Sequence, residues 1–313
     1  SRLLRAWLAR PLRDVSILTA RQQAIALFHE LTPKLATHLR ALPDIERILT
    51  RVALRSARPR DLSSLAAGLG QIPAIQQTFA PIIQQAPHSL CAHLCAHIQD
   101  PQPVVTLLTH AIKAEPPLLI RDGGVIAEGF DAELDRLRHL SENADSFLLQ
   151  LEQQERAATG IDNLKVGYNQ VSGFYIEISR LQHDKVPAHY QRRQTLKGVE
   201  RYITTELKAH EDQVLSARER ALAREKMLYE QILDALVPYL PSLRITANNL
   251  AELDVLHTLA QRATTLQWCT PQWVTHTHLQ IEQGRHPVVE AALKQTGNHP
   301  FVANDTVLNH EQQ

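Results

Sequence analysis

Hydrophobic residues recur at helical spacing through the first third of the chain. Ile45, Ile48, Leu49 and Val52, for example, are separated by three, one and three residues, so they share one face of a helix. We therefore predict a series of amphipathic helices over residues 1–113. Prolines are expected to separate these helices, at Pro11, Pro33, Pro43, Pro59, Pro73, Pro81 and Pro87.

A different helical pattern follows an Asp-Gly-Gly turn signal at 122–124. Its apolar positions alternate between spacings of four and three, which predicts a heptad seam. These positions are Phe130, Leu134, Leu137, Ala144, Leu148 and Leu151, with Ser141 in the remaining place. A seven-residue repeat returns at Leu207, Val214, Ala221, Leu228 and Ala235. A helix over 206–236 would be roughly 45 Å long, and we expect Leu228 to lie in the seam between the two long helices.

Between the two heptad patterns the period changes to two. Val166, Tyr168, Phe174, Ile176 and Ile178 alternate with polar residues, with an interruption at 169–173, which predicts two strands around a turn. A helix going out, a β tip and a helix coming back would form an antiparallel arm. An ordinary helical bundle with a hairpin insert fits this pattern equally well.

The last part of the chain begins with another predicted helix, over 245–263. Leu279 and Ile281, followed by Gly284-Arg285-His286-Pro287, indicate the opening of an α/β unit. The predicted fold class is therefore mainly α: a helical body and two long antiparallel, coiled-coil-like helices that carry a small β domain at their tip.

The composition limits the classes of function. Lys and Arg together number 33, as do Asp and Glu, so the chain lacks the overall basic charge typical of many nucleic-acid-binding domains. Three cysteines are too few for a disulfide framework and fit a reducing compartment. No apolar run reaches about 18 residues, so no membrane span is predicted. We expect a cytoplasmic protein.

The β segment is the one locally basic stretch. Between 164 and 204 seven basic residues against three acids give 7 − 3 = +4. The basic residues are Lys165, Arg180, Lys185, Arg192, Arg193, Lys197 and Arg201, and the acids are Glu177, Asp184 and Glu200. Residues 190–197 are rich in donors for phosphate oxygens, and no ladder of aromatic residues indicates single-strand binding. Charge alone, however, favours a solvated face over a binding site.

No catalytic or metal centre is predicted. Cys91, His93, Cys95 and His97 lie two residues apart on a predicted helix, so the four cannot face one ion, and buried cysteines with exposed histidines are expected instead. The sequence contains no Gly-x-x-x-x-Gly-Lys-Ser/Thr phosphate loop. We therefore expect this chain not to hydrolyse ATP and to bind no cofactor by itself.

Several ordered segments resemble the MutS family of DNA mismatch-repair proteins. They are RDGGVI at 121–126, ELD at 133–135, LKVGYN at 164–169, RRQTLK at 192–197, ERY at 200–202, ELK at 206–208, GRHPVVE at 284–290 and PFVAN at 300–304. The resemblance implies a core and lever domain over 1–163, a clamp over 164–205, returning lever helices over 206–267 and the incomplete start of an ATPase domain over 268–313. It implies that the chain is the central part of a larger protein.

The resemblance also implies functional residues and partners. The clamp of the family crosses the DNA backbone without reading bases, and we expect duplex DNA to be contacted by Lys165, Asn169, Arg192, Arg193, Thr195, Lys197 and Arg201. Phe301 and Val302 match the segment that packs on the adenine of a nucleotide. The larger protein would be an ATP-dependent mismatch-recognition homodimer that uses Mg²⁺ and a downstream factor of the MutL type. The alternative is a MutS-like protein that acts on recombination junctions or stalled ribosomes.

Two residues depart from the family pattern. Gly198 stands where bacterial relatives often have Asn, so one side-chain contact is expected to be lost. Thr205 replaces a common proline before Glu206 and is expected to loosen the junction between clamp and lever.

Overall fold

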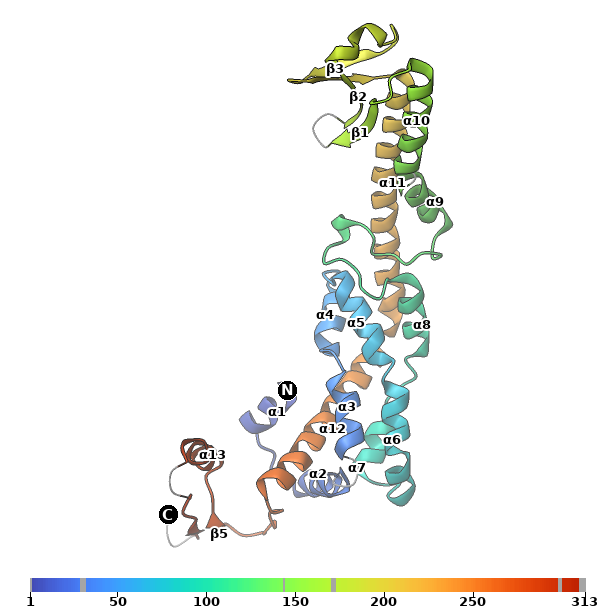
Figure 1. The fold of residues 1–313 in the computed structure, drawn as a ribbon. Coiled ribbons are helices and arrows are strands. Elements are labelled where there is room, and N and C mark those ends of the chain that lie inside the picture. Colours follow the sequence, from blue (N-terminus) through green and yellow to red (C-terminus); the bar gives the residue numbers. More distant parts are fainter. Residues whose placement is uncertain (1, 29–31, 143, 170–172, 298–299, 310–313) are drawn as a thin grey trace.

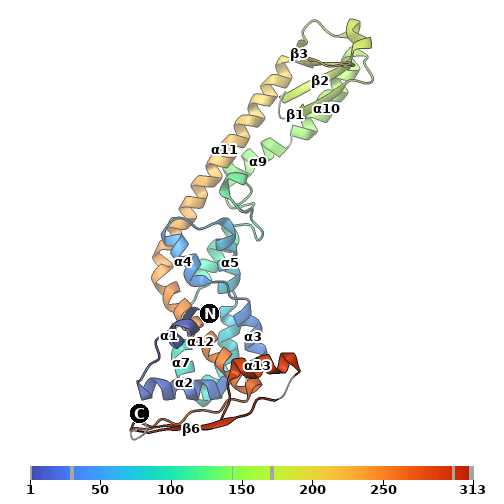
Figure 2. The ribbon, with the colours of Figure 1, turned by 90° about the vertical axis from the view of Figure 1, so that its left-hand side faces the viewer.

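The structure is a computed structural model that describes residues 2–28, 32–142, 144–169, 173–297 and 300–309. The molecule is elongated: a helical body lies at one end, an arm of helices rises from it, and a small sheet sits at the far end of the arm (Figures 1 and 2). The predicted fold class, mainly α with a β tip, is confirmed.

The body is formed by short helices from the first part of the chain and by the last long helix. These are α1 (Arg2–Ala9), α2 (Val15–Phe28), α3 (Thr32–Arg40), α4 (Ile45–Ala53), α5 (Pro59–Leu69), α6 (Ile72–Gln85), α7 (Leu90–Ala96), α8 (Gln102–Ala111) and α12 (Leu240–Leu266). Pro59 and Pro73 lie in the first turns of α5 and α6, where a missing N–H costs nothing. Pro81 was expected to separate helices, but it lies inside α6; because it is exposed, water can satisfy the carbonyl that loses its partner.

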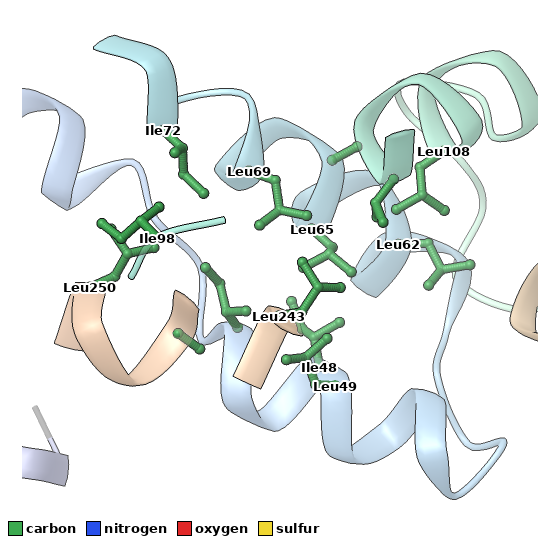
Figure 3. Close-up of a cluster of buried hydrophobic side chains, with 14 of the residues drawn as sticks. Ile48, Leu49, Leu62, Leu65, Leu69, Ile72, Ile98, Leu108, Leu243 and Leu250 are labelled. Carbon is green, nitrogen blue, oxygen red and sulfur yellow. The ribbon is translucent and has the colours of Figure 1, made fainter. Parts of the chain in front are cut away.

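The core of the body lies where α5 packs against α8 and the α4 helix packs against α12. Figure 3 shows Leu62, Leu65 and Leu69 of α5 pointing into a cluster with Ile48 and Leu243. All are almost fully buried, so the predicted amphipathic pattern describes the faces that form this core.

The arm consists of α9 (Ala132–Glu142) and α10 (Ala144–Thr159) going out and α11 (Thr205–Leu236) coming back. The α9 helix packs closely along α11, whereas α10 diverges from it in Figure 2. The α10 helix still contacts α11 through Phe147, which stacks on His210, and the sheet packs against both helices. The outgoing heptad seam therefore divides: Leu134 belongs to the core of the body, and Leu148 and Leu151 belong to a second core under the sheet. The side chain of Ala144 lies outside the described residues.

The predicted repeat on α11 holds only in part. Leu207 and Leu228 are buried, Val214 and Ala221 are half-buried, and Ala235 is exposed. The expectation for Ala235 was wrong because the buried positions change where α11 enters the body. They are Leu228, Tyr229, Ile232, Leu233 and Leu236, which follow the helical period of 3.6 and leave Ala235 just outside the buried face. Leu228 is thus buried in the core of the body, not in a two-helix seam.

After α11 the chain stays helical. A short 3₁₀ turn, η3 (Val237–Tyr239), connects α11 to α12, so the predicted helix over 245–263 is longer at both ends. The 3₁₀ turn contains Pro238, which cannot donate an N–H to the preceding turn. A nearly unbroken helical path therefore runs from the sheet through the whole body (Figure 1).

The sheet at the tip contains β1 (Lys165–Asn169), β2 (Gly173–Ser179), β3 (Gln191–Thr195) and β4 (Val199–Ile203), with the 3₁₀ segment η2 (Arg180–Lys185) after β2. The strand order is β1-β2-β4-β3 and every pairing is antiparallel. The two predicted strands are confirmed, while β3 and β4 were not predicted as strands.

The segment after α12 contains β5 (Leu279–Gly284), α13 (Pro287–Thr296) and β6 (Asn304–Leu308). A strand followed by a helix was expected from the sequence. The two strands pair antiparallel, however, so the arrangement is not the parallel β-α-β unit of an α/β domain.

Candidate nucleic-acid interface

The sheet has one buried and one open face. Phe174, Ile176, Ile178 and Tyr202 point inward and form the second core with residues of α10 and α11. The alternation predicted for β2 sets this arrangement, because each second side chain of a strand lies on the same face. The opposite face is partly exposed, and all residues of the edge strand β3 are exposed.

A cross-strand row of polar side chains crosses the open face. Lys165 of β1 lies opposite Glu177 of β2, Glu177 opposite Arg201 of β4, and Arg201 opposite Gln194 of β3. The Arg201 guanidinium donates to Glu177 Oε2 at 3.0 Å and to the Gln194 side-chain oxygen at 3.3 Å. Its carbon also lies 4.0 Å from the centre of the Tyr175 ring. Arg201 is therefore fixed within the row, and Lys165 is exposed at its β1 end.

Arg193 lies at a bulge in β3, where the pairing with β4 shifts by one residue. Its Nη1 donates to the carbonyl oxygen of Phe174 at 3.1 Å and to Glu211 Oε2 at 3.2 Å. Glu211 belongs to α11 and is nearly buried, so Arg193 connects three elements. Gly173 makes room for this contact, because a Cβ there would overlap Glu211 Oε1.

Arg192 takes part in a polar cluster on the other side of β3. Its Nη1 lies 3.3 Å from Glu200 Oε1, and Tyr202 donates its hydroxyl to the other oxygen of Glu200. The Tyr202 hydrogen bond and the Arg192 contact lower the pKa of Glu200, and burial raises the pKa of Tyr202 to about 12. The Arg192 side chain is 58% exposed, so most of its donors still face solvent.

The remaining expected contact residues are spread over the tip. Thr195 is exposed on β3, Lys197 is exposed in the turn to β4, and Asn169 is half-buried at the end of β1. The backbone N–H of Arg180 donates to the carbonyl of Gly198 at 3.2 Å, which brings η2 beside the Lys197 turn. Within the described ranges, no ion pair involves Lys165, Arg180, Lys185 or Lys197.

The structure therefore divides the basic residues into two groups. Arg192, Arg193 and Arg201 contact acids of the sheet or of α11. The cations without such a partner among the described residues lie mainly around η2 and the β3–β4 turn, at the top of the arm in Figure 1. The predicted contact residues are thus on one small domain, although not on one flat face.

Several polar contacts fasten the sheet to the arm. The Tyr190 hydroxyl donates to Glu155 of α10 at 2.7 Å, and the N–H of Val166 donates to Glu152 at 2.8 Å. On the other side, Thr204 caps the start of α11 by accepting the N–H of Leu207. This cap means that the junction at Thr205 is ordered by a hydrogen bond, without the proline that is common at that position.

Two buried acids on α11, Glu211 and Glu225, were not predicted from the sequence. Each lies four residues after a heptad position, Leu207 and Ala221 respectively, so both lie on the heptad face of the helix. A charged residue beside apolar heptad positions was the signal that could have identified them, because an acid that faces a core needs a partner there.

The assignment of Phe301 and Val302 to nucleotide binding stays a prediction. Phe301 is half-buried and Val302 is 75% exposed, in the connection between α13 and β6. This connection lies at the opposite end of the molecule from the four-stranded sheet (Figure 1).

The cysteines and histidines of α7 and its C-cap, His97, are arranged as expected. Cys91 and Cys95 are buried, and His93 and His97 are exposed. Burial raises the pKa of the two thiols to about 11 and about 12. In the described part of the chain, no group of three or more His, Cys, Asp and Glu side chains could hold a metal ion.

A family profile described as MutS domain III matches residues 1–260, which include the body, the arm and the sheet. The chain belongs to the MutS family of DNA mismatch-repair proteins. The matched region corresponds to the core and lever of the family, in agreement with the long helices observed here. Among the described residues of this MutS-family chain, no helix has both the length and the apolar character needed to cross a membrane.

Proposed function

We propose that the sheet is a clamp that grips the backbone of duplex DNA without reading its sequence, within an ATP-driven mismatch-recognition protein. The observation that carries this proposal is the cluster of cations at the tip that have no acid partner among the described residues. Phosphate oxygens are the natural ligands of such exposed lysine and arginine side chains. Family membership places the chain in mismatch repair and supports DNA as the polyanion.

The geometry supports a division of roles among the expected contact residues. Lys165 and Lys197 have no acid partner among the described residues, and Arg192 is 58% exposed although it contacts Glu200. These three would contact phosphates directly, with Thr195 on the same edge strand as Arg192. Arg193 and Arg201 use their guanidinium groups within the domain and would mainly hold the sheet in shape. Asn169 would contribute a neutral contact at the end of β1.

The helical path from the sheet to the body supports a lever role. Movement of the body would be transmitted through α12, η3 and α11 to the sheet. In this proposal ATP and Mg²⁺ act on an ATPase domain of the assembly, two clamps of a homodimer enclose the DNA, and a MutL-type factor acts downstream. The chain itself would not hydrolyse ATP, because its sequence lacks a phosphate loop. No feature of the described residues favours recombination junctions or stalled ribosomes.

The test is a salt series on DNA binding. Lys197→Glu is compared with Lys226→Glu, which makes the same charge change at an exposed position on α11 away from the sheet. Affinity for fluorescent duplexes is measured by anisotropy at several salt concentrations. Lys197→Glu is expected to weaken matched and mismatched duplexes equally and to reduce the slope of log K against log salt by about 0.9.

Two outcomes would overturn the proposal. One is that Lys197→Glu binds as tightly as the wild type at every salt concentration. The other is that Lys226→Glu has the same effect, because the loss would then reflect total charge and not a contact at the tip.

A further inference from the structure

The loop at 123–126, between η1 (Ile120–Asp122) and α9, has the geometry of an anion-binding site. Gly123 and Gly124 have φ values of +73° and +77°, a left-handed conformation that glycine adopts easily. As a result, consecutive backbone N–H groups of Gly124, Val125 and Ile126 converge on one point. Such nests of N–H groups bind anions, as in phosphate-binding loops.

The group that fills this nest is the carboxylate of Glu225, from the middle of α11. Its Oε2 accepts from Gly124 N at 2.9 Å, and its Oε1 accepts from Val125 N at 2.5 Å and Ile126 N at 2.8 Å. Glu225 is only 2% exposed. A buried charge is costly unless it is paired and hydrogen-bonded, and this carboxylate is fully provided with donors.

A guanidinium completes the site. Arg138 of α9 donates through Nη2 to Glu225 Oε1 at 2.7 Å and to the carbonyl of Ile126 at 2.9 Å. Its side chain is 17% exposed. The carboxylate thus joins the loop that leaves the body, the outgoing helix α9 and the returning helix α11 at a single point.

We propose that the 123–126 loop is a carboxylate-binding site whose ligand is Glu225, and that its occupation sets the direction of the arm. The inference is independent of DNA binding. The site lies where α11 leaves the core of the body: Leu228 and the residues after it are surrounded by apolar neighbours, whereas toward the tip α11 contacts mainly α9. An empty nest would remove this polar anchor and leave α11 held at this level by α9, by η1 and by the ion pair of Arg224 with Asp131.

The first experiment empties the site and refills it from solution. Glu225→Ala keeps a strong helix former in α11 while removing the carboxylate. We expect the Tm to fall by roughly 5–10 °C, because three N–H groups and a guanidinium lose their acceptor. Acetate should restore a large part of the loss in a saturable manner, whereas acetamide and chloride should not, since they lack the carboxylate.

Glu230→Ala is the matched control. Glu230 lies on the same helix and pairs with Arg55, but both side chains are 55% exposed. Its Tm should change little and should not respond to acetate. If acetate and acetamide act alike on Glu225→Ala, the site does not recognise a carboxylate and the inference is wrong.

The second experiment measures the arm directly. Spin labels are placed at Ser64→Cys in α5 and Thr195→Cys in β3, both exposed, in a Cys269→Ser background, since the other two cysteines are buried. The distance distribution between the labels should broaden in Glu225→Ala and narrow again with acetate. A lower Tm with an unchanged distribution would reduce Glu225 to a packing role.

Glu225→Gln covers the case in which the alanine variant does not fold. The amide keeps the volume but presents an NH₂ group toward the converging donors. We expect a broadened distance distribution, because an amide cannot accept from all the converging donors. Acetate should not narrow it, because the glutamine side chain keeps acetate out of the site. A distribution identical to that of the wild type would contradict the proposed role of the charge.

Discussion

The two ends of α11 are held by different physical means. At its lower end, Leu228, Tyr229, Ile232 and Leu233 enter the large apolar core of the body. At its upper end, Leu207 enters the smaller second core and Val214 packs against it, beside the Arg193–Glu211 pair and the ring contacts of His210. Apolar burial stabilises in proportion to area, whereas partly exposed ion pairs contribute little and are screened by salt.

This difference indicates that the body and the tip do not have equal stability. A small core that depends on polar contacts opens at a lower free energy than a large apolar core. In the proposed function, the less stable end of α11 lies at the DNA-binding surface, so local adjustment there would leave the body intact.

The largest effect is expected at the lower end of α11. Leu228→Ala should lower the free energy of unfolding by about 2–4 kcal/mol, because the cavity forms in a dense core. Leu215→Ala is the control on the same helix, where the side chain is 42% exposed, and it should cost less than about 0.5 kcal/mol. Urea unfolding followed by circular dichroism measures both. Equal values for the two variants would remove the distinction between the ends.

A smaller effect is expected from the ion pair at the upper end. Arg193→Ala and Glu211→Ala should each increase hydrogen exchange in β2 and β3, and a double-mutant cycle should give a coupling of about 1 kcal/mol that falls with salt. Amides of α5 should be unaffected. A coupling near zero would mean that Arg193 is available for DNA after all, and its assignment as a positioning residue would be wrong.

The pH response should also distinguish the two ends. His210 stacks on Phe147 with ring centres 3.6 Å apart, and its Nε2 is buried with no hydrogen-bond partner among the described atoms. Burial lowers the pKa of His210 below its ordinary value of 6.5. As the pH falls, the imidazole takes up a proton in the unfolded chain before it does so in the folded chain. Neutral His210 therefore stabilises the folded tip above about pH 6.5, and this stabilisation is lost as the pH falls below that value.

The measurement is thermal melting of the tip, followed by a fluorophore on Thr195→Cys in the Cys269→Ser background. The melting temperature of the tip should fall between about pH 7 and pH 5. In His210→Phe this fall should be smaller, because the stacked ring no longer titrates. An unchanged pH profile in His210→Phe would assign the acid sensitivity to another group.

The smallest expected effect is a gain at the tip. A Cβ at Gly198 meets no atom within 4 Å, and its φ lies outside the left-handed region, so a side chain there is tolerated. Gly198→Lys should strengthen DNA binding a few-fold and steepen the salt dependence by about 0.9, since it adds one phosphate contact. Gly198→Gln adds length without charge and should leave the slope unchanged. If both variants behave alike, the turn does not face the phosphates.

The sequence predicted the elements whose side chains repeat with a clear period. Ile176 and Ile178 identify β2 because they alternate, and the spacing from Leu207 to Leu228 identifies α11. The strand β3 could not be predicted in the same way. Its residues Gln191–Thr195 are all exposed and polar, so its strand conformation comes from pairing with β4 and not from a pattern of its own.

The candidate site was predictable in its location but not in its contacts. The local excess of basic residues identified the tip, yet it did not reveal that Arg193 reaches Glu211, which is 18 residues away on another element. A pair of this kind depends on tertiary packing. The same limit applies to Glu225, whose partners in the 123–126 loop are about one hundred residues distant in the chain.

The length of α11 has a mechanical consequence. Its 32 residues form a rod of about 48 Å. Tilting such a rod by about 5° at its lower end displaces the upper end by about 4 Å, which is more than the length of a hydrogen bond. A small rotation that begins in the body would therefore be enough to break hydrogen bonds between the tip and a ligand held in a fixed place.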